Sequence, residues 1–348
     1  MTASEAATVG AAAGAAAGAA ALYADALVWD DHSGFEPSPV ADLDQLERWR
    51  LAGVDYLSVN VGYDVITWQQ TIRSLADFRR RIALRPDRWL LVETVDDVRR
   101  AKERGLLGIT FDLEGMNALD DDLAMVAFYH RLGVRQMLFA YNLDNSAGGG
   151  CHGADVGLTA FGRDVVAEMN SVGMVVDASH CGHRTAMEAF EVSTQPVIFS
   201  HSNPWTLTQR GRNIRDEAIR GCAATGGVVG LNGIGHFMDD RDARSESIFR
   251  RIDYVVQMVG PAHAGIGLDW PFPVGGEEID SLLLRHPEFW PPGEGYGSGL
   301  YRNAVPEQVP EIAGLMVRAG YPETAVRGVL GENFLRVARQ VWPGAAAS

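Results

Sequence analysis

The sequence contains few cysteines and has fewer basic than acidic residues. Its 348 residues include 3 cysteines, an odd number with neither the spacing of a metal finger nor enough members for a disulfide framework. A reducing compartment is the simplest interpretation, which predicts a cytoplasmic protein. Basic residues number 30 against 45 acidic ones, and they form no cluster interleaved with aromatic residues. Because phosphate contacts need lysine or arginine, the net charge of -15 argues against a nucleic-acid partner.

Long apolar runs are also missing. After the N-terminus no run of about 18 strongly apolar residues occurs, so no membrane span is expected. The opening MTASEAATVGAAAGAAAGAAAL has no positive n-region, contains Glu5 and is broken by glycines, which is atypical of an export signal. We therefore predict a disordered low-complexity arm over residues 1–21, a single domain over residues 22–342, and a tail over residues 343–348.

Short runs rich in Val, Ile and Leu alternate with longer amphipathic stretches, which is typical of repeated βα units around a buried parallel sheet. Eight such runs predict a (β/α)8 TIM barrel, and about 250 residues plus insertions accommodate the chain in one domain. An open doubly wound sheet is the alternative, although no GxGxxG or P-loop follows the first run. The predicted strands are Ala26–Asp31, Asp55–Val61, Leu107–Phe111, Val134–Ala140, Met174–Asp177, Pro196–Phe199, Val228–Leu231 and Ala264–Leu268.

The segments between these runs carry helical patterns, several of them ending at glycine as a helix C-terminus does. A further run, Trp89–Val92, is interpreted as a strand outside the barrel, and Pro271–Gly299, rich in Pro and Gly, as a long loop of the kind that often forms a lid. The predicted helices are Asp42–Leu51, Phe161–Val172, His183–Glu191, Arg215–Ala224 and Arg250–Val259.

Residues with metal-ligand chemistry stand at the ends of five of these runs. In a barrel the carboxyl ends of the strands meet at one rim, where active sites lie. A single histidine near a strand end is more often structural, but five coordinated placements are hard to explain by structure alone. Neutral imidazole and carboxylate are the usual ligands of zinc and related divalent ions. The residues in question are His32, Glu114, His180, His201 and Asp269.

The sole lysine, Lys102, excludes one class of metal site. Some barrel hydrolases bridge two metal ions with a carbamylated lysine, but Lys102 lies in a helical stretch away from any strand end. A carboxylate can bridge two ions instead because it has two oxygens. Glu114 is the candidate for that bridge.

Several motifs resemble those of the membrane (renal) dipeptidases, a zinc peptidase family of the metallo-dependent hydrolase superfamily with a (β/α)8 fold. They occur in the family's order from about Ala26 to Val341, and the DASH and SHSN pair is highly specific in this context. The matching segments are FDLEGMNAL, GLTAFGRDVVAEMNSVGMVVDASH, PVIFSHSNP, RNIRDE, GIGLD and GVLGENFLRV.

The resemblance implies a role for each site residue. Glu114 is expected to bridge the metals, His180 and His201 to complete one metal site, and His32 to belong to the other. Asp269 corresponds to the acid/base. Arg212 falls on the arginine that grips the substrate carboxylate, a role suited to a planar cation.

Two positions depart from the family pattern. The family's first motif is His-x-Asp with both residues on metal, whereas this chain reads His32-Ser33-Gly34, so the second metal site lacks a carboxylate. Asp31 is a poor replacement because neighbouring residues on a strand face opposite ways. The family histidine after the fourth strand is Tyr141 here, whose hydroxyl can donate a hydrogen bond to a developing oxyanion, although it can equally be a packing residue.

The hypothesis is hydrolysis of a dipeptide or similar small amide by a metal-activated water, with one or two ions, most simply zinc. Asp269 and Tyr141 are the predicted catalytic residues, and Arg212, Tyr141 and Asn142 the predicted substrate contacts. Three alternatives remain open: a hydrolase with one metal, a metal-assisted lyase or decarboxylase on a small acid, and a binding protein without catalysis. A homodimer is compatible with the resemblance, although no segment demonstrates it.

Overall fold

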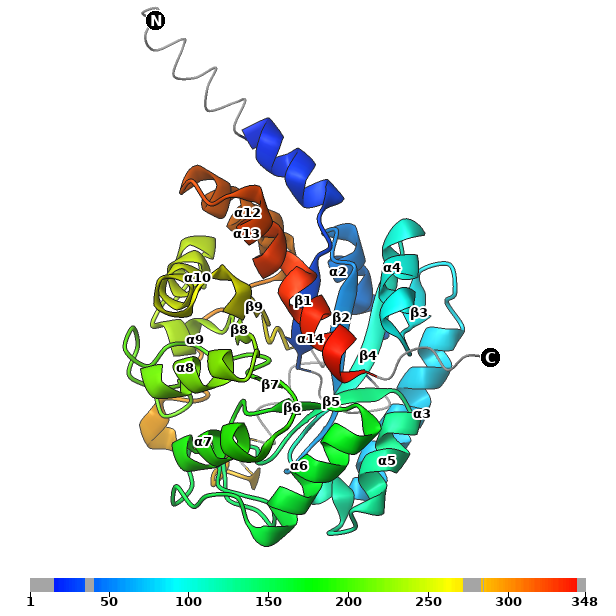
Figure 1. The fold of residues 1–348 in the computed structure, drawn as a ribbon, viewed down its shortest axis with the longest axis vertical. Coiled ribbons are helices and arrows are strands. Elements are labelled where there is room, and N and C mark those ends of the chain that lie inside the picture. Colours follow the sequence, from blue (N-terminus) through cyan, green and yellow to red (C-terminus); the bar gives the residue numbers. More distant parts are fainter. Residues whose placement is uncertain (1–15, 35–40, 272–282, 284, 343–348) are drawn as a thin grey trace, which may run out of the picture.

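The computed structural model describes residues 16–34, 41–271, 283 and 285–342 of the chain. Residues 16–25 form a helix that projects from the body of the molecule (Figure 1). The Tyr23 hydroxyl of this helix donates a hydrogen bond to the Ala52 carbonyl at 2.8 Å. The predicted arm over residues 1–21 thus ends within a helix, and its first 15 residues, like the predicted tail, lie outside the described part.

Strands of one parallel sheet form the centre of the fold. Eight of them follow the order β7-β6-β5-β4-β2-β1-β9-β8, and β3 pairs with β4 off this path. The strands are β1 (Trp29–Ser33), β2 (Tyr56–Tyr63), β3 (Trp89–Leu91), β4 (Leu107–Glu114), β5 (Val134–Leu138), β6 (Val175–Asp177), β7 (Val197–Ile198), β8 (Val229–Leu231) and β9 (Ala264–Ile266).

The two ends of this order meet and close the sheet. Phe199, which follows β7, donates its N–H to the Val228 carbonyl at 3.0 Å, and Gly230 donates to the Phe199 carbonyl at 2.7 Å. The predicted (β/α)8 barrel is therefore confirmed, and the open doubly wound sheet was the wrong alternative. The strand predicted outside the barrel is also confirmed, because β3 pairs with the first half of β4 whereas β5 pairs with its second half.

Helices surround the barrel (Figure 1). Local signals explain several of their ends: Thr67 and Gln70 form a capping box at the start of α3, and α6 ends at Gly173 with a φ of 82°. After the N-terminal helix the helices are η1 (Leu43–Leu46), α2 (Glu47–Leu51), α3 (Trp68–Ala83), α4 (Val95–Glu103), α5 (Ala124–Arg131), α6 (Ala160–Val172), α7 (His183–Val192), α8 (Asp216–Ala224), α9 (Gly235–Met238), α10 (Ser245–Val259), α12 (Val309–Arg318), α13 (Glu323–Arg327) and α14 (Asn333–Val341), with short helical turns at η2 (Asn117–Leu119), η3 (Pro261–His263), η4 (Pro292–Glu294), η5 (Pro306–Gln308) and η6 (Gly328–Glu332).

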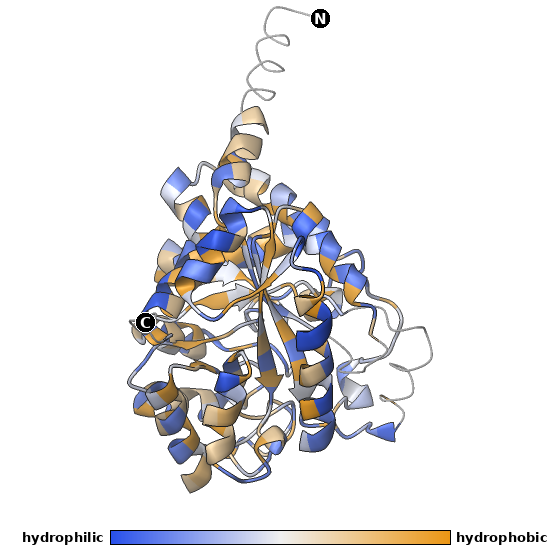
Figure 2. Ribbon diagram, turned by 90° about the vertical axis from the view of Figure 1, so that its right-hand side faces the viewer, coloured by the Kyte–Doolittle hydropathy of each residue, from blue (hydrophilic) through white to orange (hydrophobic). Residues whose placement is uncertain are grey.

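One end of the barrel is sealed by apolar side chains. Trp29 at the start of β1 stacks on Phe334 of α14 and on Tyr56 of β2, and Trp342 packs beside both aromatic strand residues. Figure 2 shows the apolar strands of the barrel and the mixed polar and apolar helices around them. Because the amino ends of the strands are covered in this way, the opposite rim is left for chemistry, as in other barrels of this type.

Candidate metal centre

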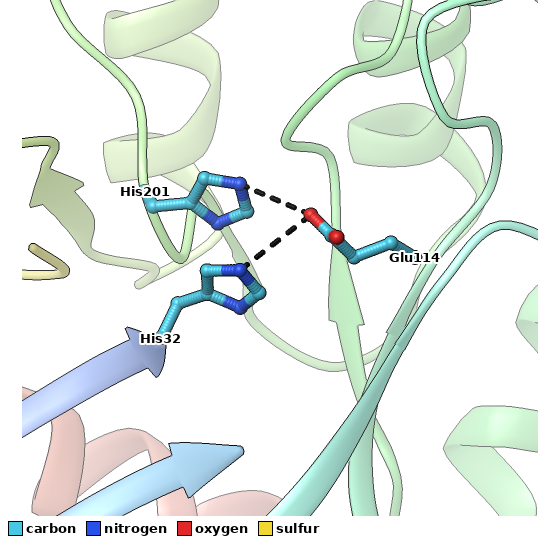
Figure 3. Close-up of side chains that lie close together, drawn as sticks. All are labelled: His32, Glu114 and His201. Atoms are coloured by element: carbon cyan, nitrogen blue, oxygen red, sulfur yellow. Dashed lines mark ion pairs between the residues drawn. The ribbon is translucent and has the colours of Figure 1, made fainter. Parts of the chain in front are cut away.

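The four predicted metal ligands meet at the carboxyl ends of the strands. His32 lies in β1, Glu114 ends β4, and His180 and His201 follow β6 and β7. Their Nε2 atoms converge on Glu114 Oε1, at 3.2 Å for His180, 3.3 Å for His201 and 3.6 Å for His32. Figure 3 shows His32 and His201 pointing at the Glu114 carboxylate. The structure therefore brings together the four residues that the sequence predicts as metal ligands.

Each of the three histidines is held through its other ring nitrogen. His180 Nδ1 donates to the Asn142 side-chain carbonyl at 2.7 Å, because that oxygen can only accept. His201 Nδ1 lies 2.7 Å from Ser200 Oγ, and the Ser200 hydroxyl in turn donates to Asp177. These contacts favour the tautomers with the proton on Nδ1, which leaves the Nε2 lone pairs facing the centre.

This arrangement fits a divalent cation. His180 Nε2 and His201 Nε2 lie 2.9 Å apart, and with both Nδ1 atoms protonated their lone pairs would repel each other unless a cation or a proton lies between them. His32 Nε2 is buried without a hydrogen-bond partner among the described residues. The ligand atoms of His32, Glu114 and His201 lie within 4.8 Å of one another. Imidazole nitrogens and a carboxylate are the donor set that zinc and its neighbours prefer.

Burial shapes the protonation of the site. It raises the pKa of Glu114 to about 8 and lowers the pKa values of His180 and His201 well below the usual range of histidine. Burial also opposes charging of His32, but the negative carboxylates Asp112, Glu114 and Asp269 outweigh it and raise the His32 pKa. His180 and His201 are therefore neutral, and burial disfavours the negative charge of Glu114. A positive ion bound among these side chains would stabilise that charge.

Asp269 and Tyr141 border the predicted metal ligands. The Asp269 carboxylate lies 3.6 Å from His32 Nε2 through Oδ1 and accepts a hydrogen bond from Asn232 Nδ2 at 2.8 Å through Oδ2. Burial raises the pKa of Asp269. The Tyr141 ring stacks on His180 with 4.4 Å between the ring centroids, and its hydroxyl accepts from Trp290 Nε1 at 3.2 Å. Both predicted catalytic residues therefore lie at the site.

Arg212 and Asn142 contact the histidines directly. The buried Arg212 guanidinium donates from Nη2 to the His201 carbonyl at 2.8 Å and from Nη1 to Ser202 Oγ at 3.0 Å. Its Nε–H has no partner among the described residues. The Asn142 amide accepts from His180 and donates to the Phe289 carbonyl at 2.8 Å, so both of its ends are engaged.

Backbone strain accompanies these positions. Asn142, His180 and Asp269 have φ values of 63°, 61° and 55°, the left-handed region that residues other than glycine rarely occupy. Such conformations persist where the surrounding contacts over-determine them, and they concentrate at functional sites.

Position 34 borders the site without offering a ligand. A Cβ atom at Gly34 would lie 3.3 Å from Asp269 Oδ1. Asp31 does not belong to the cluster of ligand atoms formed by His32, Glu114 and His201, and its Oδ1 accepts from Trp29 Nε1 at 2.7 Å. Lys102 lies where expected, on α4, with Nζ donating to the Ala26 carbonyl and to Asp55.

Sequence reasoning missed Asp112, whose Oδ1 lies 3.3 Å from His32 Nδ1. Alternation along β4 was the available signal, because residues two apart share a strand face and Glu114 was already assigned to the interior. Ser200 and Asp177, the partners behind His201, gave no such signal. Ser200 directly precedes His201, and adjacent residues of an extended strand face opposite ways.

A cavity of about 460 Å³ opens beside the metal ligands. Glu114, His180 and Asp269 contribute to its floor. The predicted loop Pro271–Gly299 contributes Pro271, Leu283, Trp290 and residues 295–299 to its lining, although residues 272–282 and 284 of this loop lie outside the described part. Aromatic side chains make up much of the remaining wall, namely Tyr63, Tyr141, Phe237 and Tyr301.

Together the closed barrel and its rim of histidines and carboxylates define a metallo-dependent hydrolase fold. More specifically, the model of the membrane dipeptidases, peptidase family M19, matches residues 39–282, and the chain belongs to this family.

Individual relatives agree with this assignment. The chain is 31% identical to an uncharacterized dipeptidase of Schizosaccharomyces pombe over 273 residues, which are 75% of this chain and 60% of that protein. Among solved structures, an amidohydrolase from Pseudomonas aeruginosa is 31% identical with a TM-score of 0.83, covering 93% of this chain and 99% of that one. A metallopeptidase from Rhodobacter sphaeroides, liganded with a phosphinate mimic of the dipeptide L-Ala-D-Ala, is 20% identical with a TM-score of 0.73, covering 91% and 100%, and shares the fold.

Across the residues that the structure describes, none of the helices combines the length and the apolar character that a membrane crossing requires.

Proposed function

We propose that this protein is a metal-dependent dipeptidase. The observation that carries the proposal is the convergence of three histidine Nε2 atoms on one Glu114 oxygen, with the Asp269 carboxylate 3.6 Å from His32 Nε2. Membership of the membrane dipeptidase family supports hydrolysis and does not favour the lyase alternative. The chain spans 60% of the length of its S. pombe relative.

His32, Glu114, His180 and His201 would hold the metal. When bound, a divalent ion lowers the pKa of a water and polarises the scissile carbonyl. Asp269 would accept a proton from the attacking water and return it to the leaving amine, a task for which a raised carboxyl pKa is useful. Asn232 donates to Asp269 Oδ2 and so orients the carboxylate with Oδ1 toward the proposed metal ligands.

The substrate would lie in the cavity above these residues. Arg212 is our candidate for the substrate's terminal carboxylate, through the Nε–H that has no partner among the described residues. Tyr141 would donate a hydrogen bond from its hydroxyl to the reacting carbonyl oxygen, because the hydroxyl accepts from Trp290 and its own O–H remains available as a donor. Asn142, like Tyr141, lines the cavity, but its engagement with His180 and Phe289 favours a role in holding His180.

Zinc is the proposed ion, because its preferred ligands match the donor set. The number of ions, one or two, stays a prediction, and Gly34 offers no side-chain ligand for a second ion. A cytoplasmic location is supported by three free cysteines, and a homodimer stays a prediction.

The test pairs metal analysis with a panel of dipeptides. Protein purified without chelator is assayed by elemental analysis, and the same sample is assayed for hydrolysis. One or two equivalents of metal with turnover would support the proposal, and the number would decide between the two stoichiometries. Absence of tightly bound metal, together with no turnover after addition of zinc, manganese or cobalt, would reject it. Glu114→Gln, which keeps the volume and removes the charge, is the matched inactive control.

A further inference from the structure

Asp112 is a buried aspartate that the proposed chemistry leaves unused. It lies on β4 two residues before Glu114 and is 2% exposed. Because side chains alternate along a strand, both carboxylates point into the barrel, with Asp112 one layer deeper. Asp112 Oδ1 lies 3.3 Å from His32 Nδ1, whereas Glu114 Oε1 lies near His32 Nε2. The two carboxylates thus face opposite nitrogens of one imidazole ring.

Two side chains of β2 fix the Asp112 carboxylate as an acceptor. Ser58 Oγ donates to Oδ2 at 2.6 Å, and Asn60 Nδ2 donates to Oδ1 at 3.1 Å. The orientation of the Asn60 amide is itself set, because its Oδ1 accepts from the Gly62 N–H at 3.1 Å. Asn60 therefore presents a donor to Asp112, and the carboxylate remains free to accept a further proton donor from His32.

This contact selects a tautomer of His32. With its proton on Nδ1 toward Asp112, His32 exposes the Nε2 lone pair to the metal centre, and Nε2 is the atom left without a hydrogen-bond partner among the described residues. The other two histidines use neutral partners for the same purpose, the amide of Asn142 and the hydroxyl of Ser200. Within the described part of the chain, His32 is the one of the three whose Nδ1 faces a carboxylate.

We propose that Asp112 is a positioning residue that holds His32 as the Nδ1–H tautomer and strengthens Nε2 as a metal ligand. A carboxylate that accepts from a ligating histidine fixes the ring and raises its basicity toward the ion. The inference rests on the proposed metal site but is separable from it, because binding and hydrolysis can persist while the contribution of Asp112 is absent.

The experiment measures the zinc dissociation constant of the apoprotein, prepared by dialysis against a chelator and titrated in competition with a chromogenic zinc indicator. Asp112→Asn keeps the shape and removes the charge, and we expect it to weaken zinc binding by about 10–100-fold, the usual cost of losing such a partner. The cobalt-loaded variant should also show a shifted visible absorption spectrum, because the His32 ligand is reoriented.

Asp31→Asn is the matched control. Asp31 is equally buried, precedes His32 on β1, and accepts from Trp29 Nε1 instead of a histidine. It should leave the zinc dissociation constant unchanged. Chemical unfolding of the two apoproteins separates a lost ligand from a damaged fold. Should Asp112→Asn not fold, Ser58→Ala, which removes one donor that orients Asp112, is expected to weaken zinc binding to a smaller extent.

The outcomes separate the two proposals. Zinc binding by the wild type that is weakened in the Asp112 variant and retained in the Asp31 variant supports the inference. Equal dissociation constants and equal cobalt spectra for the wild type and a folded Asp112→Asn, or Ser58→Ala in its place, would overturn it while leaving the metal site intact. A wild type that binds no zinc would overturn the proposed function and, with it, this role for Asp112.

Discussion

Asp269 stands close enough to the metal ligands to serve either as a ligand or as a proton carrier. Its Oδ1 lies 3.6 Å from His32 Nε2, and Asn232 holds its other oxygen. Burial raises its pKa, so a proton is exchanged at a higher pH than for an exposed aspartate. The two roles differ in what they require: a ligand contributes to metal affinity, whereas an acid/base contributes to turnover.

Asp269→Asn therefore gives a decisive measurement. As an acid/base, Asp269 contributes about 10²–10⁴-fold to kcat, and the asparagine variant should lose that factor while binding zinc as tightly as the wild type. Steady-state kinetics on a dipeptide and zinc titration of the apoprotein provide the two numbers. A variant with weakened zinc binding would instead identify Asp269 as a ligand and would require another acid/base.

Arg212 permits a test that varies enzyme and substrate together. If its guanidinium grips the terminal carboxylate, the wild type should prefer a dipeptide to the same dipeptide with a C-terminal amide by about 10–100-fold in kcat/KM, the range for a hydrogen bond between charged groups. Arg212→Gln should abolish this preference. Arg210→Gln, two residues away and near Asp239, should retain it. An unchanged preference in the Arg212 variant would show that another group recognises the carboxylate.

The sequence predicted the residues that converge at the centre but not the residues behind them. His32, Glu114, His180 and His201 could be found because each stands at the end of an apolar run and the barrel brings such ends together. Asp112 did not stand out because it lies within a strand and not at its end. Ser200 did not stand out because it directly precedes His201. Strand β7 ends at Ile198, and beyond that point the backbone no longer imposes alternation, so Ser200 Oγ reaches the Nδ1 of its neighbour His201.

Strand β4, which carries Asp112 and Glu114, is flanked by two glycines with different surroundings. Gly105 precedes the strand with a φ of 65°, and a Cβ there would meet nothing within 4 Å. Gly115 follows it with a φ of 117°, and a Cβ there would lie 2.1 Å from the Asp64 carboxylate. Asp64 accepts from the Asn117 N–H at 2.9 Å and from the Tyr141 N–H at 3.0 Å. Asp64 thus joins the loops after β4 and β5, and the absence of a side chain at Gly115 leaves room for it.

Alanine at the two positions should have unequal effects. Gly105→Ala places a side chain in a left-handed conformation with free space around it and should cost about 1 kcal/mol of unfolding free energy. Gly115→Ala adds a steric overlap with Asp64 and should cost about 3 kcal/mol or more. Urea unfolding measures both. Zinc affinity should fall in Gly115→Ala alone, since Glu114 is the preceding residue; equal losses of stability would contradict this account of β4.

For helices and strands, the sequence predicted which elements occur better than it predicted where they begin and end. The predicted helix Arg250–Val259 is the second part of α10, which begins at Ser245, and the predicted helix Asp42–Leu51 is divided into η1 and α2. The loop after β9 shows why. Trp290 donates to the Tyr141 hydroxyl and the Phe289 carbonyl accepts from Asn142, so its described part is placed by tertiary contacts that no local pattern encodes.

The closed barrel links the proposed metal site to the stability of the whole domain. Its ligands come from β1, β4 and the segments after β6 and β7, so they come together only when the sheet has closed. These residues are far apart in sequence, so in the unfolded chain they are also far apart in space and form no site. An ion that binds the folded state alone must therefore stabilise the entire domain, by an amount set by its concentration and dissociation constant.

Removal and return of zinc should shift the thermal unfolding midpoint reversibly. At a free zinc concentration about 100 times the dissociation constant, binding contributes about 2.7 kcal/mol, which for a chain of this length corresponds to a rise in Tm of about 4 °C. Differential scanning calorimetry of the apoprotein, with and without zinc, gives the shift. His201→Ala removes one of the converging Nε2 atoms and should show a much smaller response. If the wild-type midpoint stays constant while zinc is demonstrably bound, the ion occupies a site outside the barrel rim. An ion held by residues from four separate parts of the fold must resist the separation of those parts on unfolding, and so must raise the midpoint.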